Sequence, residues 1–75
     1  MQFDKELDAR GLNCPLPIIK TKKALNDLGS GQVLRVTSTD SGSLKDMEAF
    51  AKQTGNDLVA QETVGSEFIS VLRRR

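Results

Sequence analysis

The segment Leu12-Asn13-Cys14-Pro15-Leu16-Pro17-Ile18-Ile19 contains the only cysteine of the chain and both of its prolines. Apolar residues recur with helical spacing after the cysteine, which predicts a helix over Pro15–Leu28. Proline suits the first position of a helix because the N–H that it lacks would be unpaired there. The residue before a proline is pushed out of the helical conformation, so we expect Cys14 at the N-cap.

This position would give Cys14 the electrostatic environment of a helix start. Pro15 and Pro17 have no N–H, so Leu16 is left as the donor that we expect to point at the sulfur. The positive end of the helix dipole contributes about 0.3–1 kcal/mol and favours a thiolate, so the pKa of Cys14 should be lowered only slightly. The alternative is that Cys14 is a small buried hydrophobe, as unpaired cysteines usually are.

The composition predicts one small domain without metal or disulfide support. The chain has 75 residues, 37% of them hydrophobic, and a net charge of +1, which argues against nucleic acid as the main partner. No apolar stretch approaches membrane length, and the N-terminus has no apolar signal core. We therefore expect a cytoplasmic monomer with a reduced cysteine and no membrane partner.

Period-two patterns and turn residues predict the remaining elements. Strands are expected over Phe3–Ala9, Gln32–Thr39, Asp57–Val64 and Ser66–Arg73, with a second helix over about Leu44–Thr54. The resulting order is β-α-β-α-β-β. Right-handed crossovers put both helices on one face, which predicts an α+β two-layer sandwich with a mixed four-stranded sheet and an open outer face.

Cap residues are expected at both ends of the predicted helices. Gly29 and Gly55 suit the left-handed position that ends a helix. Ser43, with Asp46 three residues later, resembles a capping box for the second helix. Asp40 is a competing cap if that helix begins earlier.

The residue types around Cys14 exclude several chemistries. The chain has no histidine, so a Cys-His catalytic pair within one protomer is excluded, and one cysteine without histidine does not make an ordinary metal site. There is no Cys-x-x-Cys for dithiol exchange. No cofactor is predicted. A nucleophilic sulfur remains, which accepts and hands on a group whose chemistry another protein drives.

Charged residues suggest where such a protein would bind. Lys20 and Lys23 share one helix face after the cysteine, which is either an attractive surface for an acidic partner or an ordinary solvated face. Asp40 either lines the rim of the cysteine site or caps the second helix, and the sequence favours the cap.

The run Leu7–Pro17, read as Leu-Asp-Ala-Arg-Gly-Leu-Asn-Cys-Pro-Leu-Pro, resembles the signature of the TusA (SirA-like) sulfur carrier family, whose mark is Cys-Pro-x-Pro. The resemblance covers nearly the whole chain, which predicts one such domain over residues 1–75. Many members have Asp-Pro after the second strand. Here Asp40-Ser41 stands in that place, so the loop is expected to be looser.

The resemblance implies a fold, an activity and partners. The family sheet has the order 1-2-4-3, and the family cysteine carries sulfane sulfur as a persulfide, which here implies a sulfurtransferase role for Cys14. Pro15, Leu16 and Pro17 correspond to the supporting motif. Family donors are cysteine desulfurases or rhodaneses, and acceptors are further relay proteins in transfer-RNA thiolation, cofactor assembly or sulfur metabolism.

A second hypothesis is a non-catalytic interaction or regulatory module in which Cys14 is incidental. Such a module would use the open sheet face or the lysine face. The exposure of Cys14 distinguishes the two hypotheses, because a buried sulfur would favour the second.

Overall fold

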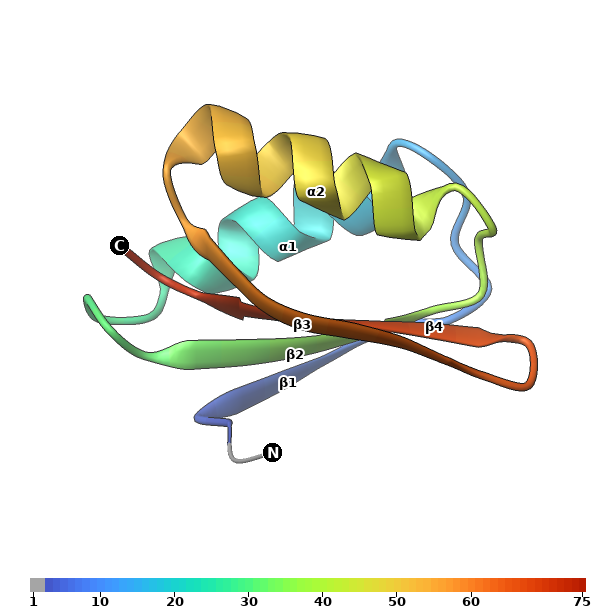
Figure 1. Cartoon of the computed structure of the whole chain (residues 1–75), viewed down its shortest axis with the longest axis horizontal. Helices are drawn as coiled ribbons and strands as arrows, with labels where there is room; N and C mark the ends of the chain where they lie inside the picture. Colours follow the sequence, from blue (N-terminus) through green and yellow to red (C-terminus); the bar gives the residue numbers. More distant parts are fainter. Residues whose placement is uncertain (1–2) are drawn as a thin grey trace.

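The computed structural model describes residues 3–75, in which two helices cover one face of a four-stranded sheet (Figure 1). The strands are β1 (Lys5–Ala9), β2 (Val33–Ser38), β3 (Asp57–Val64) and β4 (Glu67–Arg73), and the helices are α1 (Leu16–Asn26) and α2 (Ser43–Thr54). The predicted β-α-β-α-β-β order is confirmed. Residues 1 and 2 of the expected domain lie outside the described residues. No helix within residues 3–75 is long and apolar enough to span a bilayer.

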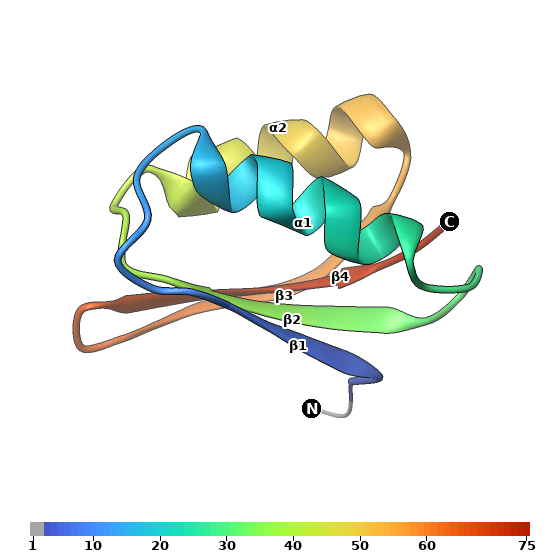
Figure 2. The ribbon, with the colours of Figure 1, turned by 180° about the vertical axis from the view of Figure 1, so that it is seen from behind.

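The strands lie in the order β1-β2-β4-β3, as the family resemblance implied. β1 and β2 are parallel, with Leu7 opposite Val36, and β4 runs antiparallel to both β2 and β3. Parallel neighbours need a crossover connection, and α1 supplies it between β1 and β2. Seen from behind, both helices lie on the same side of the sheet, and the other side is open (Figure 2).

Both helices begin one residue away from the predicted position. α1 begins at Leu16 with Pro15 as its N-cap, so the prediction of Cys14 as N-cap and Pro15 as first helical residue is wrong. α2 begins at Ser43 after Gly42, and no side chain caps it, so the predicted Ser43 capping box is wrong. The Ser43 hydroxyl is instead buried without a hydrogen-bond partner among the described residues.

The C-terminal ends of the helices differ from each other. Gly55 ends α2 in the left-handed conformation at φ 76°, as predicted. α1 ends in a right-handed turn at Asp27, whose N–H donates to the carbonyl of Ala24 at 3.2 Å. The left-handed residue comes later, at Gly31 with φ 84°, so the prediction for Gly29 is wrong.

The core lies between the sheet and the two helices. Leu34, Met47 and Leu72 are fully buried there, and burying a side chain of this size contributes about 1.5–3 kcal/mol. The other buried members of this cluster are Ala9, Ala24, Leu25, Leu28, Val36, Phe50 and Ala51. This packing fixes the start of α1 and the start of α2 above the same edge of the sheet (Figure 1).

Candidate functional site

Cys14 lies in the loop between β1 and α1, two residues before the helix begins. Its side chain is exposed, so the reading as a buried hydrophobe is wrong. The peptide bond between Cys14 and Pro15 is cis. The exposure of the sulfur favours the hypothesis that Cys14 takes part in transfer chemistry over the hypothesis that Cys14 is incidental.

Two hydrogen bonds from the end of β2 fasten this loop. The Gly11 N–H donates to Thr39 Oγ1 at 2.9 Å, and the Cys14 N–H donates to Asp40 Oδ2 at 3.1 Å. These contacts form because β1 and β2 are parallel, so the C-terminal ends of the two strands lie together, with Ala9 opposite Ser38. The sheet topology thus determines where the sulfur lies.

Asp40 connects the cysteine loop to the loop before α2. Besides the Cys14 N–H, its carboxylate accepts the Gly42 N–H at 3.3 Å. The helix-cap role that the sequence favoured is therefore wrong, since α2 has Gly42 as its N-cap and no side-chain cap. Asp40 lies instead at the rim of the cysteine site, which was the other interpretation.

The electrostatic environment of the sulfur differs from the one predicted. The Leu16 N–H donates to the Asn13 carbonyl at 2.9 Å, so this N–H is already engaged by a neighbour in the loop. The carboxylate of Asp46, in the first turn of α2, raises the pKa of the Cys14 thiol. Partial desolvation and the charge of Asp40 act in the same direction. The predicted lowering of the Cys14 pKa is therefore wrong for the protein without a partner.

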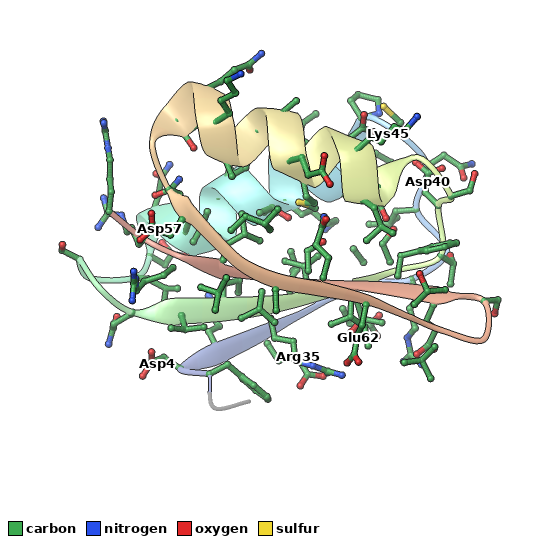
Figure 3. All side chains as sticks on the ribbon, in the orientation of Figure 1. Asp4, Arg35, Asp40, Lys45, Asp57 and Glu62 are labelled. Atoms are coloured by element: carbon green, nitrogen blue, oxygen red, sulfur yellow. The ribbon has the colours of Figure 1, made fainter. Side chains whose placement is uncertain are left out.

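Sequence reasoning considered Asp46 only as a capping residue and missed its effect on the pKa of Cys14. The two residues are 32 positions apart, and only the shared edge of the sheet brings α2 to the cysteine loop. Figure 3 shows Asp40 and Lys45, the residue before Asp46, at this end of the molecule. The sequence did contain one signal that Asp46 would lie on the same side as Cys14. The predicted crossover topology places the starts of both helices above the same edge of the sheet.

The remaining motif residues and their neighbours differ in how deeply they are buried. Pro17 is buried, and its carbonyl accepts the Thr21 hydroxyl at 2.7 Å, so this proline anchors the first turn of α1 in the core. Leu16 and Ile19 are exposed apolar side chains, 45% and 56% accessible, and sequence reasoning did not single them out as surface residues.

Lys20 and Lys23 are exposed on α1, as expected for either interpretation of that face. At a rise of about 1.5 Å per residue, they follow the first helical residue by roughly 6 and 10 Å. Both lysines therefore lie on the helix that begins two residues after Cys14.

Comparison of this chain with known protein families agrees with its motif, its topology and its exposed cysteine. The model of the family described as Sulfurtransferase TusA matches residues 5–74. The chain belongs to the TusA family. The resemblance that the Cys-Pro-x-Pro motif predicted is thereby confirmed.

Named relatives align with most of the chain. The "Sulfur carrier protein TusA" of Allochromatium vinosum is 57% identical over 96% of this chain and 95% of its own length. The "Putative sulfur carrier protein YrkI" of Bacillus subtilis is 52% identical over 87% of each chain. The crystal structure of a SirA-like protein from Desulfitobacterium hafniense superposes with a TM-score of 0.82 and 28% identity, covering 93% of this chain and 96% of the other.

Proposed function

We propose that this TusA-family chain is a sulfur carrier that receives sulfane sulfur on Cys14 as a persulfide and passes it to a partner. The observation that carries the proposal is the exposure of its only cysteine, at a loop fastened by Gly11 and Asp40. Residues 1–75 act as one carrier domain. Membership in the TusA family and the names of its relatives support the same role.

Loading and unloading are two exchanges of the same kind. The Cys14 thiolate attacks the terminal sulfur of a donor persulfide, a new S–S bond forms on Cys14, and the donor S–S bond breaks to leave a thiolate. The negative charge passes from Cys14 to the leaving donor thiolate, and any proton on the donor persulfide stays on the transferred sulfur, so no oxidant or reductant is consumed. An acceptor thiolate then removes the same sulfur and leaves Cys14 reduced.

The chain supplies a nucleophile and its position, and its partners supply the rest. In line with the family resemblance, the donor is a cysteine desulfurase or a rhodanese, and the acceptor is a further relay protein. This transfer is the sulfurtransferase activity that we assign to the chain. Because it requires a reduced thiol, it suits the cytoplasm.

An interaction module remains the second candidate, because the open sheet face is hollowed. A pocket of about 470 Å³ lies there, lined by Phe3, Arg35, Glu62, Ile69 and Val71 among others. Arg35 and Glu62 both point to this open side (Figure 3). A module of this kind would bind its partner without any change at Cys14.

Mass spectrometry after incubation with a sulfane-sulfur donor tests the proposal. The intact protein should gain about 32 Da per sulfur atom, the added sulfur should map to Cys14, and reduction should remove it. Cys14→Ser should remain folded by circular dichroism but should gain no mass. A wild-type protein that never gains sulfur from desulfurase, rhodanese or thiosulfate would contradict the carrier proposal and favour the interaction module.

A further inference from the structure

A second hollow lies at the end of the molecule opposite Cys14. It has a volume of about 310 Å³ and is enclosed by the last turns of α1 and α2 and by the segment that follows β4. Figure 2 shows the C-terminal end of the chain beside the last turns of both helices. α1 has 11 residues, so at a rise of about 1.5 Å per residue its end lies roughly 15 Å from the turn next to the cysteine loop. The hollow is therefore separate from the sulfur site.

The polar side chains that line this hollow are cations and amides. They come from both helices and from the segments after α2 and β4, and they are Lys22, Asn26, Gln53, Asn56, Arg74 and Arg75. No carboxylate side chain is among the lining residues within positions 3–75. The whole chain has a net charge of only +1, so three cations around one hollow are a local concentration of positive charge.

The acids that adjoin the hollow in sequence are occupied by other cations. Asp27 pairs with Lys5 at 3.7 Å, and Asp57 pairs with Arg73 at 2.6 Å. The three cations that line the hollow take part in none of the ion pairs of the described residues. Their charge is therefore available to a ligand.

The helix ends explain only part of this positive charge. A helix C-terminus is partly negative and attracts cations, and Arg74 Nη1 does donate to the Leu28 carbonyl that follows α1. A guanidinium has five N–H donors, so four of those of Arg74 remain. The last turn of α2 has its own cation in Lys52, which does not line the hollow.

Arg75 is held at the hollow by its neighbours. Asn56 Oδ1 accepts the Arg75 backbone N–H at 3.0 Å, and Asn56 Nδ2 donates to Thr54 Oγ1 at 2.8 Å. The Arg75 side chain lies against Gly55, where a Cβ atom would be only 3.1 Å from Arg75 Nη1. Gly55 also has a positive φ of 76°, so this position favours glycine for two reasons. The side chains around the hollow are therefore partly organised before any ligand binds.

We propose that this hollow binds an oligophosphate, a small anion with two or three linked phosphate groups. Arginine offers planar pairs of N–H donors that match phosphate oxygens, and lysine adds a compact charge. Pockets of about 300 Å³ and more hold ligands larger than a single phosphate, so the volume and the three cations together favour linked phosphates. This inference does not depend on whether Cys14 carries sulfur.

The backbone of RNA offers the same phosphate chemistry. A chain that binds nucleic acid usually carries a clear excess of positive charge over a broad face, and here the net charge is +1. The three cations surround one hollow and do not form a long stripe. We therefore assign the site to the free anion.

An NMR titration of the ¹⁵N-labelled chain with inorganic triphosphate, pyrophosphate and phosphate tests the proposal. The amide signals of Gly55, Asn56 and Arg75 should shift and saturate, with triphosphate binding most tightly and phosphate most weakly. Lys22→Gln and Arg75→Gln should each weaken triphosphate binding roughly two- to fivefold, and higher salt should weaken it further. Lys45→Gln, the same charge change at the exposed start of α2, should leave the affinity unchanged.

The outcomes separate a built site from general surface charge. Shifts that do not saturate, equal affinities for the three phosphates, or an equal loss in Lys45→Gln and Lys22→Gln would overturn the proposal. Tighter binding of a short single-stranded RNA than of triphosphate would overturn the assignment to a free anion. Each variant should keep the wild-type spectrum away from its substitution, which shows that a lost affinity is not a lost fold.

Discussion

At the scale of single residues, Asp40 determines how the cysteine loop is held. Its carboxylate accepts the Cys14 N–H and the Gly42 N–H, which joins the segment before α1 to the segment before α2. No other side chain is hydrogen-bonded to the Cys14 backbone among the described residues. The Cys14 backbone is therefore held directly by one carboxylate that is 26 residues away in the sequence.

Asp40→Ala should loosen this loop and destabilise the protein. It removes the partner of two backbone donors that are only partly shielded from water, so we expect a loss of about 1 kcal/mol in the free energy of unfolding. Urea unfolding measures it, with the exposed neighbour change Ser41→Ala as the control, expected within about 0.5 kcal/mol of wild type. Equal stabilities for the two variants would show that water replaces Asp40 without cost.

At the scale of elements, an ion-pair cluster joins the end of β1 to the start of β4. Arg10 Nε and Nη2 donate to the two carboxylate oxygens of Asp8 at 2.9 and 3.0 Å, and Nη1 lies 3.5 Å from Glu67 Oε2. These hydrogen bonds from Arg10 lower the pKa of Asp8 to about 2. Arg10, the central residue of this cluster, is the first residue of the loop that leads from β1 to Cys14.

The Asp8 carboxyl should titrate at an unusually low pH. Its pKa is depressed in the folded protein, so its contribution to stability is present above the unfolded value of about 3.9 and is lost as the pH falls through about 2. Carboxyl-carbon chemical shifts in NMR measure this directly. In Arg10→Gln the titration should move up towards the ordinary value, while Arg73→Gln, which pairs with Asp57, should leave Asp8 unchanged.

Helices and strands could be predicted from the sequence where the burial of apolar side chains is enough to determine them. Ala24 and Leu25 of α1, and Met47, Phe50 and Ala51 of α2, face the core, and the apolar spacing of each segment predicted its helix. The start of α1 was misplaced because the Leu16 N–H donates to the Asn13 carbonyl, a loop contact that no periodicity encodes. The effect of Asp46 on the pKa of Cys14 was missed because it arises only when the sheet brings the start of α2 near the cysteine loop.

At the scale of the whole molecule, the surface around the sulfur is divided by charge. Asp40 and Asp46 lie beside Cys14 on the side of α2, and Lys20 and Lys23 extend from it along α1. We therefore predict that a partner that approaches the sulfur meets acidic side chains and basic side chains at once. Such a pattern fixes the orientation of docking as well as its rate.

Reversing the lysine charges tests this orientation. We expect Lys20→Glu with Lys23→Glu to slow loading of Cys14 by a protein donor several-fold at low salt, because both positions lie within about one Debye length of the helix start. Iodoacetamide alkylation, which needs no docking, should change little. The difference in loading should shrink as salt is raised.

The matched control is Lys52→Glu with Arg75→Glu, which changes the net charge by the same amount at the opposite end of α2. Arg75 lies against Gly55, where α2 ends, so neither control position is near the sulfur. If the two double variants load at the same rate at low salt, the α1 lysines are an ordinary solvated face. If only the α1 variant is slow, the donor approaches along α1 with an acidic surface.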